Sequence, residues 1–239
     1  MRRYLKIYHH PAHLLITIGI ILLPLIFVAF VLPFSVHQKE LFAQDLLAST
    51  LRLFIAYVIS IFLALFFALF LTHGKLGDFF LPFFDVMQSF PTFAMLPLVV
   101  HYFGAGSVTV IIFLVVTVIW PILFAIISAQ KLVKEEWDEA ATIFGAKGWK
   151  RLLYYSLPLS YPGLITGSIV GLGEGWEAVV GAEIIVGLDK SGLGNFFSAN
   201  SESSRMVLFG VLALLVCIFV LNKLIWLPLL EKSHKLLTD

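Results

Sequence analysis

Charged residues are scarce in this chain of 239 residues. They make up 13% of it, hydrophobic residues make up 60%, and the mean hydropathy is +0.98. Soluble domains are about half apolar and about a quarter charged, so this composition excludes an ordinary soluble domain. It predicts an integral membrane protein instead. The formal net charge of +1 also excludes the basic face that nucleic-acid binding requires.

The chain has a single cysteine and lacks the common nucleotide-binding and catalytic motifs. The single cysteine, Cys217, lies in an apolar run, which excludes an intrachain disulfide and argues against a thiol metal cluster. His9, His10 and His13 fit an interfacial basic cap better than a metal site. The sequence has no GxxxxGK[ST] loop for ATP, no HExxH motif and no credible catalytic triad. We therefore expect no catalytic residues, no metal and no cofactor in this chain.

What the chain has in abundance is long apolar runs. Six are near or above the ~20 residues that span a bilayer, at about 14–34, 46–72, 79–103, 107–129, 158–187 and 205–230. The first run is longer than the apolar region of a signal peptide, so we expect a retained span. Arg52 lies near the start of the second run, close enough to the interface to snorkel. The sequence thus predicts an all-α membrane domain of six transmembrane helices over 1–239.

The basic residues predict the orientation of these spans. The amino end, the second and fourth loops and the tail carry eleven Lys and Arg residues, and the other loops carry three. Because basic residues accumulate on the cytoplasmic side, we expect both termini and the fourth loop in the cytoplasm.

The fourth loop, from Lys131 to Pro158, is a polar segment between two apolar runs. Trp137, Ala141 and Phe144 recur at the spacing of one helix face, and Gly145 interrupts the pattern as glycine does at a helix end. A second short helix over about 147–155 would follow. We therefore predict a cytoplasmic helix–turn–helix between the fourth and fifth spans.

This segment resembles the coupling loop of the permease subunits of binding-protein-dependent ABC importers. The resemblance rests on an EAA-xxx-G core and a closing Leu-Pro; the residues are Glu139, Ala140, Ala141, Gly145, Leu157 and Pro158. Tyr155 departs from the pattern, which has an aliphatic residue there. The resemblance implies that these residues dock into a groove of an ATPase subunit and transmit its motion.

Further stretches resemble the nitrate/sulfonate/taurine branch of these permeases. They are a Q-S-x-P element that begins at Gln88, the stretch LPLSYPGLITG after the loop, and the G-L-G turn at 192–194. The resemblance covers about 45–230. It implies one half of a dimeric permease, a second permease subunit, two ATPase subunits, an extracytoplasmic solute-binding protein and the prokaryotic inner membrane. The branch handles nitrate, sulfonates, taurine, bicarbonate and some vitamin precursors.

The fifth span carries small and acidic residues with separate interpretations. Glycines recur every fourth residue, at Gly163, Gly167, Gly171 and Gly175, which favours close helix packing, within the subunit or at a dimer interface, over a helix that slides or bends during transport. Carboxylates inside a span normally face a cavity or a partner.

Three glutamates in this span cannot share one face of a straight helix. At about 100° per residue, Glu174 and Glu177 lie near one another and Glu183 lies almost opposite Glu174. We expect a structural hydrogen-bonding role for Glu183, for which Gln would suffice. For Glu174 and Glu177 a substrate contact and a buried helix-pairing role remain open, and with Gln88 they are the candidate pathway residues.

The resulting hypothesis is an importer permease for a small polar solute. A secondary transporter or channel that uses the intramembrane carboxylates is the alternative, and a membrane-embedded enzyme is a third class without a catalytic constellation to support it. The spans hold carboxylates and almost no deep basic residue, which leans toward a neutral, zwitterionic or cationic solute.

Overall fold

The computed structural model describes residues 35–71, 74–133, 135–187, 191–226, 228–230 and 232, and the expected first span at 14–34 lies outside them. The described part is helical and contains no strand. Its long helices are α3 (Val36–Phe66), α4 (Gly74–Gln88), α5 (Thr92–Phe103), α6 (Ser107–Lys131), α9 (Leu157–Val186) and α11 (Ser204–Leu221). Its short helices are α7 (Glu135–Ile143), α8 (Gly148–Arg151) and α10 (Leu193–Ala199), with π-helical turns η2 (Phe67–Leu71), η3 (Leu152–Ser156) and η4 (Asn222–Trp226).

Local sequence explains where two of the long helices begin. Ser35 and Gln38 form a capping box at the start of α3, because each side chain satisfies a backbone N–H of the other. Ser203 caps α11 by accepting from the backbone N–H of Met206. Both caps give a hydrogen-bond partner to a backbone N–H in the first turn of an apolar helix, which would otherwise be unpaired.

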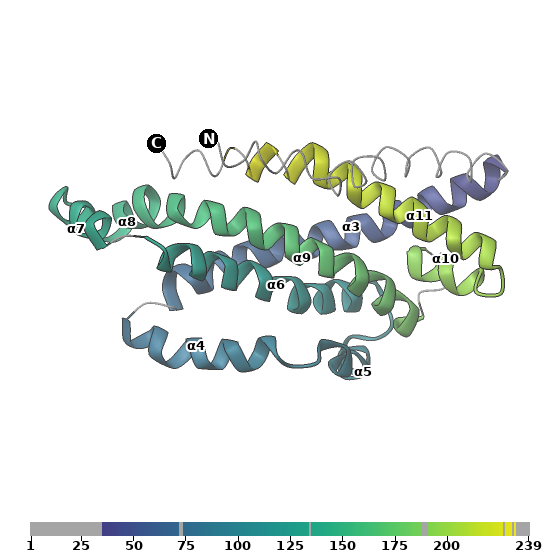
Figure 1. Ribbon diagram of the computed structural model, residues 1–239. Helices are drawn as coiled ribbons and strands as arrows, with labels where there is room; N and C mark the ends of the chain where they lie inside the picture. The colour runs from purple at the N-terminus through teal and green to yellow at the C-terminus, as the bar shows by residue number, and fades with distance from the viewer. Residues whose placement is uncertain are drawn as a thin grey trace, which may run out of the picture.

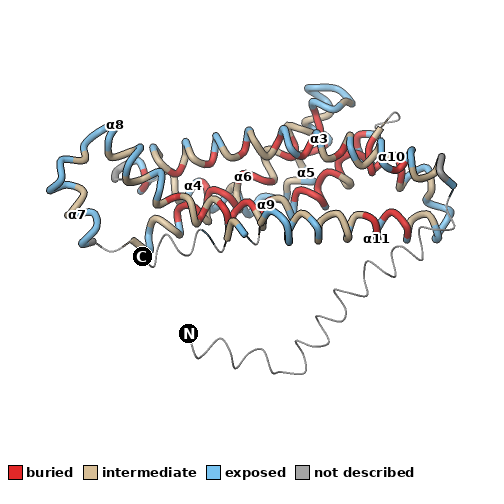
Figure 2. The backbone as a smooth tube through the Cα atoms, turned by 90° about the horizontal axis from the view of Figure 1, so that it is seen from above, coloured by how far each residue is buried: buried red, intermediate tan, exposed pale blue. Residues whose placement is uncertain are grey.

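The helices α3, α6 and α9 form the centre of the molecule, and α11 runs along them (Figure 1). The segment with α7 and α8 lies at one end of this bundle and α10 at the other (Figure 1). Buried residues concentrate where the long helices face one another, and the α7–α8 end is largely exposed (Figure 2). The core therefore lies between the long helices, and the α7–α8 end remains available for other contacts.

The glycine stripe of α9 packs against α6. A Cβ added to Gly163 would lie 2.4 Å from the carbonyl oxygen of Ala125, and one added to Gly167 would lie 2.6 Å from the Cα of Ile122. Gly171 faces Val118 in the same way, farther along both helices. The stripe therefore serves packing within this chain, because only glycine lets the two backbones approach so closely.

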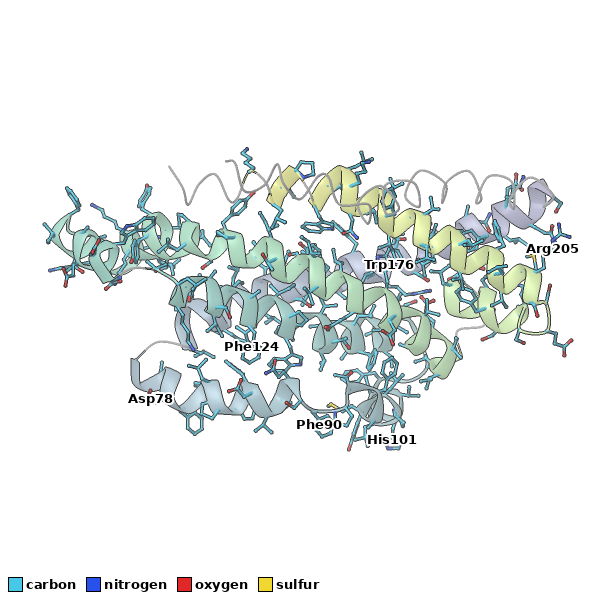
Figure 3. All side chains as sticks on the ribbon, in the orientation of Figure 1. Asp78, Phe90, His101, Phe124, Trp176 and Arg205 are labelled. Carbon is cyan, nitrogen blue, oxygen red and sulfur yellow. The ribbon has the colours of Figure 1, made fainter. Side chains whose placement is uncertain are left out.

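The expected third span is broken into two helices rather than continuous. Helices α4 and α5 meet at an angle of 91° across Ser89–Pro91. Pro82 and Pro97 lie inside helices, so only Pro91 interrupts the run. The residue before a proline is pushed out of the helical region, which explains a break at this point. The side chain of Phe90 lies at this break (Figure 3).

Length and composition identify three helices in the described part that could cross a membrane. They are Gln38–Leu71, Ser107–Lys131 and Ser204–Leu230, and the bent α4–α5 pair would make a fourth. Helix α9 falls outside this set, since its glycines and glutamates lower its hydropathy. It nevertheless packs along most of the length of α6, so any slab of lipid that α6 crosses also contains α9.

A buried ion pair joins α3 to α9. The guanidinium of Arg52 donates to the Glu183 carboxylate over 2.6 Å, and the two side chains are 10% and 0% exposed. Ser49 also donates to this carboxylate, over 2.8 Å, and the backbone N–H of Gly194 donates to it over 2.9 Å. The remaining donors of Arg52 bind Ser107 and Ser191. The charges are thus paired and hydrogen-bonded, as buried charges must be.

The turn before α10 is fitted onto this ion pair. Gly192 has a φ of 125°, and a Cβ there would lie 2.5 Å from the carboxylate of Glu183. Its N–H donates to Asp45, while the N–H of Leu193 donates to Ser49. A side chain at Gly192 is therefore excluded by both conformation and space.

This arrangement corrects the expectation for Arg52. We expected its side chain to snorkel to the membrane interface, but it is buried and paired with a residue 131 positions away in sequence. Opposite charges inside a membrane protein pair because each is expensive alone. The tolerance expected for Glu183→Gln is withdrawn for the same reason, because that change would leave the guanidinium without a counter-charge.

We predict that Glu183→Gln lowers the free energy of unfolding by about 3–5 kcal/mol, the loss typical when one partner of a buried ion pair is removed. Thermal unfolding of the detergent-purified chain measures this loss. Glu202→Gln is the matched control, since Glu202 is exposed at the same end of the bundle. Equal melting temperatures for Glu183→Gln and the wild-type chain would show that the pair does not stabilise the fold.

Candidate functional site

The first candidate site is the 131–158 segment, which begins with α7. This helix ends in a Schellman motif: the N–H of Ala146 donates to Ala141 O over 2.9 Å and the N–H of Gly145 to Thr142 O over 3.0 Å. Gly145 has a φ of 75°, in the left-handed region that favours glycine. The glycine-ended helix predicted from sequence is confirmed. The signature residues Glu139, Ala140 and Ala141 lie in its second half.

The second helix of this segment is not a separate one. Helix α8 continues through η3 directly into α9, with Leu157 and Pro158 at the start of α9. Proline has no N–H to donate, and a π turn directly before it shifts the hydrogen-bond register. The expected stop at Tyr155 is therefore wrong, and the segment is one short helix joined by a turn to an extension of the fifth span.

Ionic contacts hold α7 to this extension. Arg151 forms an ion pair with Asp138 and also donates to the hydroxyl of Thr142 over 3.2 Å. Its guanidinium lies 5.4 Å from the ring centre of Tyr155, within cation–π range. Partial burial and the neighbouring Asp138 carboxylate raise the pKa of the Tyr155 phenol. Tyr155, the departure from the family pattern, thus belongs to the contact that orients α7.

Large apolar side chains are exposed on this otherwise charged segment. Ile143 is 82% exposed, Phe144 89% and Trp149 68%. They lie around the turn between α7 and α8, at the end of the bundle (Figure 1). Exposed apolar groups that gather at one place mark an interaction surface more often than isolated ones do.

The second candidate site is a groove between α6 and α9. Its apolar part has a volume of about 600 Å³ and reaches from Ala125 on α6 and Thr166 on α9 down to Trp137 on α7. Trp137 therefore links the 131–158 segment physically to the groove. The remaining lining residues are Ser128, Ala129, Leu132, Val133, Leu159, Pro162 and Gly163.

A polar cavity of about 290 Å³ lies farther along α6 and α9, and we call it the Glu174 cavity. It is formed at the point where α4 breaks into α5. Its lining residues are Gln88, Phe90, Thr92, Thr117, Trp120, Pro121, Val170 and Glu174. Thr166, Val170 and Glu174 follow one another at four-residue intervals, so both cavities lie along one face of α9.

The candidate pathway residues are only partly brought together. Gln88 and Glu174 line the same cavity, whereas Glu177 is exposed one turn farther on and is not part of its wall. Glu183 lies in the buried network with Arg52, away from this cavity wall. The sequence interpretation that separated Glu183 from Glu174 agrees with these positions.

Sequence reasoning missed part of the cavity wall. Thr117 and Trp120 lie three residues apart on α6, and Phe90 and Thr92 flank Pro91. The polar Thr117 within a very apolar helix was a usable signal for α6. The residues at the break had no comparable signal, because their position depends on a bend that periodicity does not describe.

Comparison with known proteins identifies the protein family of this chain. The family model described as "Binding-protein-dependent transport system inner membrane component" matches residues 56–226. An ABC transporter permease protein of Methanocaldococcus jannaschii is 34% identical over 122 residues, which cover 51% of this chain and 45% of that protein.

Two further relatives carry the names of solutes. The taurine transport system permease protein of Escherichia coli is 29% identical over 143 residues, 59% of this chain and 51% of its own length. The nitrate import permease protein of Leptolyngbya laminosa is 26% identical over 146 residues, 60% and 52% respectively. The chain thus spans about half the length of these relatives. It belongs to the inner-membrane permease family of binding-protein-dependent ABC transporters, in the nitrate, sulfonate and taurine branch.

Proposed function

We propose that this chain is one permease subunit of an ABC importer, crosses the inner membrane six times, and transmits the motion of an ATPase subunit through the 131–158 segment. A second permease subunit, two ATPase subunits and an extracytoplasmic solute-binding protein complete the transporter. Both termini and the 131–158 segment face the cytoplasm.

The exposed apolar turn between α7 and α8 is the observation that carries this proposal. Ile143, Phe144 and Trp149 are large and exposed, yet they belong to a segment rich in charge. The neighbouring Lys147 and Lys150 are exposed as well. A partner protein in water satisfies both, with an apolar pocket for the turn and polar groups around it.

The groove offers a physical route from this turn to the pathway. Trp137 on α7 lines the end of the groove that lies nearest to α7. The ion pair between Arg151 and Asp138 connects α7 to the extension of α9. A displacement of α7 therefore changes the groove wall directly. We propose that alternating access proceeds by this displacement, because packed interfaces shift between discrete arrangements rather than deforming continuously.

The groove also supplies the solute pathway. Glu174 is exposed near the middle of α9, and a carboxylate facing lipid at that depth costs about 2.5–3.5 kcal/mol. A water-filled pathway between two permease subunits removes this cost. The transported solute is a small polar molecule, in keeping with relatives named for taurine and nitrate.

The first test removes the apolar anchor of the turn. We predict that Phe144→Asp lowers the affinity for the ATPase subunit about tenfold or more, since burial of one such side chain contributes about 1.5–3 kcal/mol. The measurement is retention of the ATPase by the detergent-purified permease. Tyr102→Asp is the matched control, because Tyr102 is 78% exposed on α5.

Equal loss in the two variants, or no loss in Phe144→Asp, would contradict docking through the turn. A chain that works as a secondary transporter or channel would move solute without any ATPase, and Phe144→Asp would leave its transport unchanged.

The second test concerns topology. In a Cys217→Ala background, we predict that Lys147→Cys in intact cells reacts with an impermeant thiol reagent only after the cells are opened. Ser201→Cys, in the exposed turn before α11, should react from outside. Both positions are exposed in the structure, so the contrast reports the side of the membrane rather than burial. Labelling of position 147 from outside would overturn the orientation.

A further inference from the structure

We propose that the Glu174 cavity holds a small solute that carries a positively charged nitrogen, such as an ammonium group, and discriminates against simple anions. This inference rests on the proposed function, since it names the class of solute that the pathway accepts. It is carried by the charge of the cavity wall, by its aromatic groups and by its size.

Charge is the first argument. Among the described residues, Glu174 is the only ionisable side chain in the cavity wall. Glu177, one turn away, has the same sign and strengthens the negative potential. Arg52 is paired with Glu183 and Arg151 with Asp138, so neither of these arginines neutralises Glu174. A cavity lined by one sign of charge within low-dielectric walls concentrates counter-ions and repels co-ions.

The aromatic and polar wall groups are the second argument. Phe90 and Trp120 come from the α4–α5 break and from α6, and aromatic faces attract cations. The hydroxyl of Thr117 donates to Phe113 O over 3.0 Å, which leaves its oxygen free to accept from the solute. A carboxylate, an amide and hydroxyl oxygens thus surround the cavity with acceptors for N–H donors.

Size limits the solute further. The volume of about 290 Å³ lies at the small end of ligand sites in proteins. Phe90, at the α4–α5 break, lines this part of the groove. A second copy of this chain across the pathway would add another Glu174 and no basic residue from the same wall, which preserves the preference for cations.

The test measures the charge preference inside the cavity on the full chain. Val170→Cys in a Cys217→Ala background places a thiol in the cavity wall. The rate at which this thiol reacts is then measured with two methanethiosulfonate reagents of opposite charge, one with a trimethylammonium group and one with a sulfonate. We expect the cationic reagent to react about tenfold faster once intrinsic reactivities towards a free thiol are divided out. Choline should protect the thiol from it, and nitrate should not.

Glu174→Gln in the same background should remove most of this preference and the protection by choline. Glu177→Gln is the matched control and should retain most of both, since Glu177 is not part of the wall. Equal rates for the two reagents, an unreactive thiol, no protection by choline, or a preference that survives Glu174→Gln would overturn the inference. The assay needs no ATPase, so its failure is distinct from failure of the docking test on Phe144.

Discussion

The buried Arg52–Glu183 ion pair is the interaction on which the rest of the structure depends. It joins α3 to α9 and accepts the turn before α10 through the backbone N–H of Gly194. Breaking such a pair leaves an uncompensated charge in the interior, which is far more costly than losing an exposed one. The end of the bundle that contains α10 therefore tolerates little structural change. Even a Cβ atom at Gly192 would clash with the Glu183 carboxylate.

This constraint determines which parts of the chain remain able to act. Gly163, Gly167 and Gly171 hold α9 closely against the part of α6 between Val118 and Ile126. The groove face and the 131–158 segment have few such contacts and carry exposed carboxylate and apolar groups. Function is thus expected at the two places where the fold leaves costly groups uncovered, and Trp137 lies where these places meet.

Local sequence patterns predicted much of this structure. They could not predict which side chains pair across segments that are far apart in the sequence. Gly145 could be identified as a helix end because a positive φ at that position depends on its immediate neighbours. Pairing of Arg52 with Glu183 depends on two spans coming together, so Arg52 was assigned to the interface instead. The bend at Pro91 was visible as a proline, but its angle and the cavity beside it depend on how α5 packs against α6 and α9.

The central claim is that the turn between α7 and α8 contacts an ATPase subunit. Site-directed cross-linking of the assembled transporter tests it most directly, with Ile143→Cys as the probe and Tyr102→Cys as the control in a Cys217→Ala background. Both side chains are exposed, 82% and 78%. We predict a covalent adduct between position 143 and the ATPase subunit, and none from position 102. An adduct from position 102 alone, or from neither position while the complex stays intact, would contradict it.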